Sequence, residues 1–171
     1  MNETMPKLHL TLLAGAAALI APVGMPSSTA AAAVAGDGAC VAGRPSVQVR
    51  VTGFKQPTGT VKVAVYAERK FLTKAGTLGK VKLPVHSSGP MDICLAVPGP
   101  GRYAVAVHHD LNGNRSKDRA DGGGFSRNPQ LSIVNLRPRF NAASFDVEAS
   151  TRVVPVRLQY LQGLRIAPIQ S

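Results

Sequence analysis

Hydrophobic and polar residues alternate along most of the chain after residue 44, and this alternation predicts β-strands. In residues 46–53 three valines at alternate positions share one face of the segment, and polar side chains share the other. The same period recurs in further short segments bounded by Gly, Pro, Asn and Asp, namely 59–67, 79–86, 91–97, 101–109, 130–136, 143–149 and 151–161. Pro84 marks one of them as an edge strand, because proline has no N–H to donate to a neighbouring strand. Residues 71–76 and 139–145 are each expected to contain a helical turn.

About seven to eight short strands without a long helix predict an all-β fold, namely an antiparallel Greek-key β-sandwich of the prealbumin-like or immunoglobulin-like kind. The segment "VPGPGRYAVAV" supports this fold, because a Pro-Gly turn leads into a strand with Tyr103 near its start. That is the pattern of a tyrosine corner, in which the phenol hydroxyl bonds to the backbone across the corner. The alternative is that Tyr103 is an ordinary core aromatic residue.

The first 35 residues predict an export signal rather than a part of the fold. A basic start is followed by an apolar run that Pro22 interrupts, and then by small residues. Cleavage after Ala35 would leave a single β-sandwich domain, residues 36–171, in the periplasm or outside the cell. No later run is long or apolar enough to cross a bilayer, so the mature chain is not expected to be transmembrane. An uncleaved anchor is the alternative.

Two cysteines, Cys40 and Cys94, are present in the chain. One pair of cysteines in an exported protein predicts a disulfide, because the compartments outside the cytoplasm are oxidising. The bond would tie the start of the mature chain to the strand predicted at residues 91–97.

The chain is strongly basic, with 20 Lys and Arg, 9 Asp and Glu, and a formal net charge of +11. Much of this charge falls on outward positions of the predicted strands, namely Arg50, Lys62, Lys80, Lys82 and Arg157. A solvated face explains most of it, but the summed field attracts anions. In an exported protein those partners would be anionic envelope polymers or lipid headgroups. Nucleic acid is not expected, because of the compartment and because few aromatic side chains are available for stacking on bases.

The run "VHHDLNGNRSKDRADGGGF", residues 107–125, has the ligand spacing of a calcium loop. Calcium loops present oxygens at positions 1, 3, 5, 7, 9 and 12, and these positions would fall on Asp110, Asn112, Asn114, Ser116, Asp118 and Asp121. Arg115 stands where such a loop wants glycine, and two further basic residues in the loop would repel a cation. The sequence therefore leaves two interpretations open, a weak calcium site and a polar turn whose Asx side chains bond to their own backbone.

A catalytic interpretation of the same run would use His109 and Asp110 as a dyad, with Ser126 as the nucleophile. His108 and His109 are neighbours on a predicted strand, so they point to opposite faces and cannot share one substrate. No nucleophile motif such as G-x-S-x-G surrounds Ser126. A structural histidine bonded to the loop backbone is favoured, and a hydrolase is kept as an alternative.

The chain also resembles a known family in three of its segments: "GRYAVAVHHDLNGNRSKD", "GGGFSRNP" and "RPRFNAASFDV". These segments are similar to the uncharacterised exported bacterial family catalogued as domain of unknown function 2141. The positions that match its motifs are His109, Asp110, Asn112, Gly113 and Asn114, then Phe125, Ser126 and Asn128, and finally Phe140, Ala143 and Phe145. Family members usually have glycine at the position of Arg115 and an aromatic residue at that of His108. The resemblance implies an envelope β-sandwich, similar to prealbumin-like or carboxypeptidase-regulatory-like domains, and no established activity.

These observations lead to one main hypothesis and two alternatives. The main hypothesis is a periplasmic or secreted, non-enzymatic binding or accessory module, with a weak calcium site in residues 110–121. The first alternative is an anion-binding envelope protein that works through its basic strand faces. The second is a hydrolase that uses His109 and Asp110.

Overall fold

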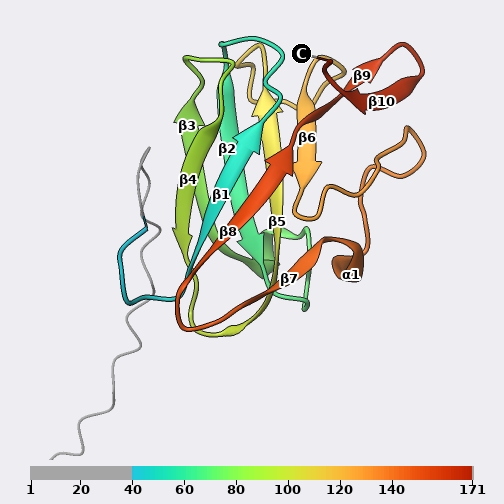
Figure 1. Cartoon of the computed structure of the whole chain (residues 1–171). Coiled ribbons are helices and arrows are strands. Elements are labelled where there is room, and N and C mark those ends of the chain that lie inside the picture. Colours follow the sequence, from blue (N-terminus) through green and yellow to red (C-terminus); the bar gives the residue numbers. More distant parts are fainter. Residues whose placement is uncertain (1–39, 171) are drawn as a thin grey trace, which may run out of the picture.

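Two β-sheets packed face to face make up the protein in this computed structural model, which describes residues 40–170 (Figure 1). The smaller sheet has the strand order β4-β1-β8 and the larger one the order β10-β9-β6-β5-β2-β3, with β7 paired to β5 as well. The smaller sheet consists of β1 (Ser46–Thr52), β4 (Met91–Ala96) and β8 (Thr151–Arg157). The larger sheet consists of β2 (Thr60–Tyr66), β3 (Thr77–Pro84), β5 (Gly101–Asp110), β6 (Gly122–Phe125), β7 (Ser144–Val147), β9 (Gln159–Gln162) and β10 (Arg165–Pro168). The predicted export signal and its cleavage site lie outside the described residues.

The core between the sheets consists mainly of the residues that the alternating pattern predicts. The alternate valines of β1 and β2 are fully buried in one cluster, namely Val47, Val49, Val51, Val61, Val63 and Val65. Each such side chain contributes about 1.5–3 kcal/mol when it leaves water. The outward positions between them carry the exposed basic residues, including Arg50 and Lys62. The all-β sandwich is therefore confirmed, and the period-two pattern is its cause.

Several local predictions are also confirmed. A 3-10 turn (Lys74–Gly76) and the short helix α1 (Phe140–Ala143) lie within the two segments expected to contain helical turns. The strand that holds Pro84 is the edge strand β3. Tyr103 forms the tyrosine corner, because its hydroxyl donates to the carbonyl of Gly99 at 2.8 Å. Within residues 40–170 no helix is long and apolar enough to span a membrane.

The disulfide joins Cys40 to Cys94, as the cysteine count predicts. Cys94 lies in β4 opposite Gln48 of β1, and the two bridged Cα atoms are 5.4 Å apart. The bond therefore fixes the first described residue of the chain to the smaller sheet.

Other strand predictions are wrong. Residues 130–136 form no strand, because Ser132 and Asn135 exchange backbone hydrogen bonds and close a tight turn instead. Residues 151–161 divide at Leu158 into β8 and β9, which belong to different sheets. Strands β1 and β8 pair in parallel, so the smaller sheet is not purely antiparallel. With β6 and β10 added, ten strands are present among residues 40–170, compared with the seven or eight predicted.

Strand β6 has the sequence "GGGF", which no strand propensity predicts. Glycine is needed in β6 because other segments of the same polypeptide approach its backbone closely. A Cβ atom at Gly122 would collide with the ring of Tyr160, and one at Gly124 would press on Val156 and the backbone of Arg157. The strand thus depends on residues that follow it by more than thirty positions.

Candidate functional site

The polar loop of residues 110–121 leaves the end of β5 and returns to β6 (Figure 1). Its side chains bond mostly to one another and to the loop backbone. The Asn114 N–H donates to Oδ1 of Asn112 at 3.1 Å, and the Ser116 N–H donates to Oδ1 of Asn114 at 2.8 Å. These are the local bonds of Asx turns. The six residues of the predicted calcium site are therefore neighbours in one loop.

Asp118 is the acceptor at the centre of the loop. Its Oδ2 accepts the side-chain amides of Asn112 and Asn114, each at 2.8 Å, and its Oδ1 accepts the Ala120 N–H at 2.8 Å. These donors stabilise the carboxylate, so they lower the pKa of Asp118, with the Asn112 amide as the largest cause. The two asparagine amides thus turn their nitrogen atoms toward Asp118. For either asparagine to bind a cation next to Asp118, its side-chain amide would have to rotate so that the oxygen faces Asp118 in place of the nitrogen.

Asp110 differs from the rest of the loop because it is almost completely buried, with 4% of its surface exposed. Its Oδ2 accepts the backbone N–H of Arg115 at 3.0 Å. Its Oδ1 is buried and has no hydrogen-bond partner among the described residues. A buried carboxylate oxygen without a partner is costly, so it is the one oxygen of the loop that a cation would relieve. Within residues 40–170, however, no group of three His, Cys, Asp or Glu side chains is placed to hold a metal ion.

Arg115 has a positive φ of 64°, the left-handed conformation in which glycine is favoured. Calcium loops have glycine at this position, and the positive φ of Arg115 is the backbone geometry that glycine adopts there. In this conformation the Arg115 N–H donates to Oδ2 of Asp110.

His108 and His109 point to opposite faces of the larger sheet, as their adjacency predicts. His108 lies on the outer face, where its Nε2 is 3.0 Å from Oδ2 of Asp121. The other oxygen of Asp121 accepts the Leu111 N–H at 3.2 Å. Asp121 thus connects the outer face of β5 with the start of the loop.

His109 lies inside the sandwich, and its surface is fully buried. Its Nδ1 is 2.6 Å from the hydroxyl of Tyr160, and its Nε2 is 2.8 Å from the carbonyl oxygen of Thr58. A carbonyl only accepts, so Nε2 carries a proton and donates it to Thr58. Burial disfavours the charged ring and lowers the pKa of His109, although the Thr58 carbonyl opposes this shift.

Neither His109 nor Ser126 is arranged for hydrolysis. Both ring nitrogens of His109 have structural partners, and its side chain has no access to solvent. Ser126 is also fully buried, accepts the Val105 N–H at 2.9 Å and donates to the carbonyl of Ala143. Ser126 thus lies beside Val105, which precedes His109 by four residues on β5. This spacing separates the side chains of Ser126 and His109 by about 13 Å. The geometry assembles no catalytic dyad or triad from these residues.

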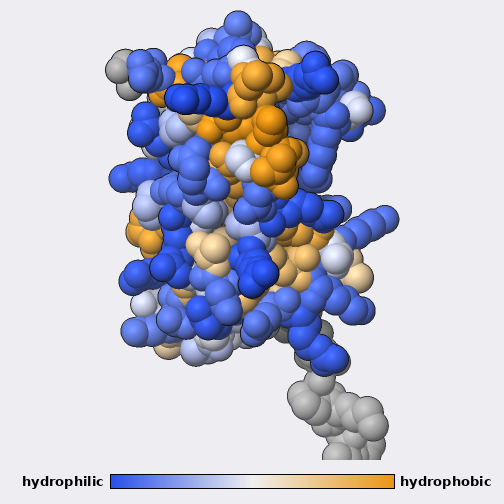
Figure 2. Space-filling view, turned by 90° about the vertical axis from the view of Figure 1, so that its right-hand side faces the viewer, coloured by the Kyte–Doolittle hydropathy of each residue, from blue (hydrophilic) through white to orange (hydrophobic). Residues whose placement is uncertain are grey.

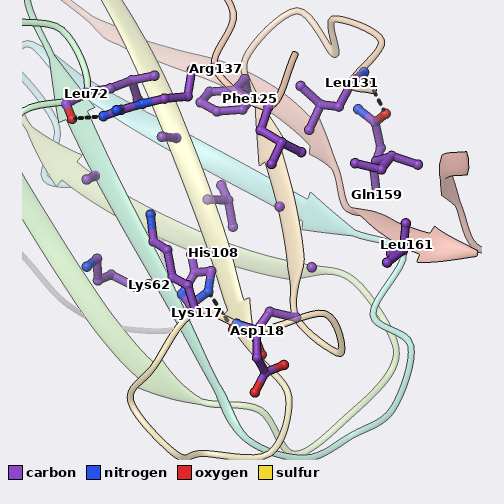
Figure 3. A pocket seen from close by; sticks show the side chains of 18 of the residues that line it. Lys62, Leu72, His108, Lys117, Asp118, Phe125, Leu131, Arg137, Gln159 and Leu161 are labelled. Carbon is purple, nitrogen blue, oxygen red and sulfur yellow. Dashed lines mark hydrogen bonds and ion pairs between the residues drawn. The ribbon is translucent and has the colours of Figure 1, made fainter. Parts of the chain in front are cut away.

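A groove of about 600 Å³ lies across the outer face of the larger sheet (Figure 3). Part of its floor is made of small residues: Ala64 of β2 lies opposite Ala106 of β5, and Gly123 of β6 lies opposite His108, two positions further along β5. Sequence reasoning missed this groove. The available signal was alanine in place of charged residues at the outward positions of "KVAVY" and "YAVAV", which is typical of a covered rather than a solvated face.

The walls of the groove come from residues 127–139, from the turn after β2 and from strands β6, β9 and β10. Residues 127–139 cross the edge of the sheet, and Nη2 of Arg137 donates to the carbonyl of Leu72 at 2.9 Å, which links this segment to the turn after β2. Phe125 and Leu131 are packed with Phe140 in a second, smaller apolar cluster. The bulky apolar residues that line the groove are Leu72, Phe125, Leu131, Ile133, Leu136, Leu161 and Ile166.

Basic side chains gather at the other end of the groove. Lys62 and His108 are cross-strand neighbours, and Lys117 of the loop lies beside them, apart from Phe125 and Leu131 (Figure 3). Four of the lining residues are Lys or Arg, of which Arg137 lies at the opposite end beside Leu72 (Figure 3), and two are Asp. Asp121 contacts His108, whereas Asp118 accepts the neutral amides of the loop asparagines and keeps its negative charge. The groove therefore combines apolar walls with a basic end.

Fold and groove together define an all-β sandwich protein with a concave surface on its larger sheet. Residues 49–154 match the family described as an uncharacterized protein conserved in bacteria, DUF2141, and the chain belongs to this family. No curated protein and no solved structure was found to match the chain.

Proposed function

We propose that the protein is an exported, non-enzymatic binding module, and that the groove on its larger sheet binds an anionic amphiphile, a small molecule with one negative group and a hydrocarbon part. The observation that carries this proposal is the presence of apolar walls and a cationic end in one groove. Its volume of about 600 Å³ lies within the range of small-molecule sites, roughly 300–1,000 Å³. Burial of the hydrocarbon would supply most of the affinity, and Lys62 with Lys117 would orient the negative group.

An anionic polymer fits the groove less well. A polyanion gains from rows of cations along a path, whereas much of this groove offers only hydrocarbon to its ligand. The remaining basic residues on exposed strand faces, such as Lys80 and Lys82, would bring anions near the protein at low ionic strength.

Binding of dodecanoate, measured by titration calorimetry, tests the proposal. Dodecanoate should bind, whereas acetate, which has the same head without the chain, should not. Gly123→Val should abolish binding, because a side chain at this outward position fills the floor of the groove. A Cβ atom there meets only the carbonyl oxygen of Val107, at 3.9 Å, so the variant should fold.

The charged end is tested with a matched pair of variants. Lys62→Gln should weaken dodecanoate binding, while Arg152→Gln, the same charge change on an exposed residue of β8, should leave it unchanged. Unchanged dodecanoate affinity in a folded Gly123→Val protein would exclude the groove as the binding site.

A second proposal is that the loop of residues 110–121 binds calcium weakly. The buried Oδ1 of Asp110, which has no partner among residues 40–170, supports it. With few carboxylates and three basic residues in the loop, the expected dissociation constant is on the order of 0.1–1 mM. The ion would stabilise the turn and would take no part in the groove. Calorimetry of Asp110 variants tests this proposal, as argued in the Discussion.

A further inference from the structure

Two tight turns present apolar residues to solvent on the same side of the molecule. Ser132 and Asn135 close the first turn with backbone bonds of 3.2 and 3.0 Å, which leaves Ile133 and Val134 at its tip. The second turn joins β9 to β10 through Gly163 and Leu164. Val134 is 90% exposed and Leu164 is 85% exposed.

Such residues are unusual at these positions. The central residues of tight turns are typically Gly, Asn, Asp, Pro or Ser, because these residues suit the backbone and remain hydrated. Gly163, with a φ of 62°, meets the backbone requirement of the second turn, so the leucine beside it is not needed for the geometry. Four of the seven large hydrophobic residues exposed within residues 40–170 belong to the two turns and their flanks: Ile133, Val134, Leu136 and Leu164.

The two turns form parts of one surface. At their bases, the Leu131 N–H donates to Oε1 of Gln159 at 3.2 Å, and Nε2 of Gln159 donates to the carbonyl of Pro129 at 2.9 Å. Gln130 adds a bond of 2.9 Å to the carbonyl of Ile166 in β10. Figure 2, which looks at the side on which Figure 1 draws β9, β10 and residues 127–139, shows a hydrophobic patch surrounded by hydrophilic residues.

The two segments that carry the patch have charges of only one sign, and Asp118 and Asp121 lie in the adjoining groove. Residues 127–145 and 159–170 contain arginines but neither Asp nor Glu. Arg139 and Arg165 are exposed beside the two turns. A surface that binds a protein usually carries charges of both signs, whereas a surface that binds phosphate headgroups carries cations alone. Apolar tips flanked by basic residues match the two layers of a lipid interface, with hydrocarbon below and phosphate above.

We infer that this surface docks on a lipid membrane with anionic headgroups, with Ile133, Val134 and Leu164 entering the acyl region and the flanking arginines contacting phosphates. The docked face lies beside the groove, because Ile133 and Leu136 also line it. Docking does not require the groove to hold a ligand, so it stands independently of the proposed function.

The absence of tryptophan from the chain allows a direct test. Single-tryptophan variants Val134→Trp and Leu164→Trp place a fluorophore on each tip, and Val153→Trp places one on an exposed residue of β8 in the other sheet. On addition of phosphatidylglycerol vesicles, the emission of the two tip variants should shift to the blue, and brominated lipid should quench it. Val153→Trp should show neither effect, and phosphatidylcholine vesicles should act weakly on all three.

Sedimentation with the same vesicles measures the energetic contribution of the tips. The double variant Val134→Ser, Leu164→Ser should bind phosphatidylglycerol vesicles roughly tenfold or more weakly than the original protein. Val153→Ser should leave binding unchanged, and so should Gly123→Val, which fills the groove. Equal vesicle binding by the original protein and the double serine variant would overturn the inference, since the basic faces would then suffice. A dimer that the double serine variant dissociates, without any tryptophan shift on lipid, would overturn it in favour of a second copy of the chain.

Discussion

The hydroxyl of Tyr160 lies 2.6 Å from Nδ1 of His109 in the interior of the sandwich. The same hydroxyl accepts the backbone N–H of Lys55 at 3.2 Å. Because Nε2 of His109 donates to a carbonyl, Nδ1 of the neutral ring accepts the tyrosine proton, and both ring nitrogens and the phenol hydroxyl have partners. Burial raises the pKa of Tyr160 to about 12 and keeps the phenol protonated. With the imidazole neutral, the Tyr160 hydroxyl donates to Nδ1 of His109 and links β9 to β5.

The first prediction concerns the dependence of stability on pH. The pKa of His109 is lowered from its usual value near 6.5, so the unfolded chain takes up a proton that the folded chain does not. Stability from the neutral ring is complete above pH 6.5 and falls as the pH drops below it, by up to about 1.4 kcal/mol per pH unit. Urea unfolding between pH 7.5 and 5 should show a shallower loss for His109→Gln than for the original protein. His86→Gln, which changes an exposed histidine, should keep the original slope.

The second prediction compares two neighbouring glycines. Gly122→Ala should destabilise the protein by about 1–3 kcal/mol, because its Cβ would collide with the ring of Tyr160. Gly123→Ala should change stability by no more than about 0.5 kcal/mol, because its Cβ points into open space on the groove side. Thermal unfolding of the two variants checks this, and equal losses would contradict the packing described for β6.

The sequence predicts those features that depend on neighbouring residues. Alternation over a few positions is enough to place Val47 and Val61 in the core, and a Pro-Gly turn with a following aromatic residue is enough to place Tyr103 at a corner. The disulfide follows from the number of cysteines. Each of these inferences uses a local rule or a simple count, and the structure confirms them.

Features that depend on distant contacts could not be predicted in this way. The glycines of β6 are needed because Tyr160 and Val156, far along the chain, pack against them. Residues 130–136 have the alternation of a strand, but they close a turn and line the groove instead. The groove arises from the combination of that segment with small residues on three different strands. The alternation of hydrophobic and polar residues within a strand does not indicate whether another segment of the chain covers the outward face of that strand.

The third prediction concerns Arg115, whose positive φ costs an arginine about 1–2 kcal/mol. Arg115→Gly should remove this strain while keeping the backbone bond to Asp110, and the flexibility of glycine in the unfolded state should offset part of the gain. A net stabilisation of roughly 0.5–1 kcal/mol is expected in urea unfolding. Arg119→Gly makes the same change in the same loop at a residue without a positive φ, so it should give no gain.

The fourth prediction concerns the bond between Cys40 and Cys94, which are 54 residues apart. On the chain-entropy view, a loop of this length lowers the free energy of folding by about 4 kcal/mol. Reduction should therefore lower the melting temperature strongly, and Cys40→Ser should behave like the reduced original protein. Cys40→Ser is preferred to Cys94→Ser because Cys94 is buried. An unchanged melting temperature after complete reduction would mean that the tether contributes little.

The last prediction decides between the two interpretations of the loop. If calcium binds with a dissociation constant on the order of 0.1–1 mM, then 10 mM calcium should stabilise the protein by about 1.4–2.7 kcal/mol through mass action. Asp110→Ala should abolish this gain, because it removes the buried carboxylate, whereas Asp146→Ala, at an exposed site on β7, should keep it.

If the loop is only a polar turn, the same variants behave differently. Asp110→Ala then removes the hydrogen bond to the Arg115 N–H and lowers the free energy of unfolding by about 1 kcal/mol, with or without calcium. Asp110→Asn keeps an acceptor for that N–H and replaces the oxygen that lacks a partner, so it should recover most of this loss. Scanning calorimetry of the original protein and the three variants, each with calcium and with chelator, separates the outcomes. A transition of the original protein that chelator and 10 mM calcium leave at the same temperature would exclude the ion site, and Asp110 would then act only through its backbone bond.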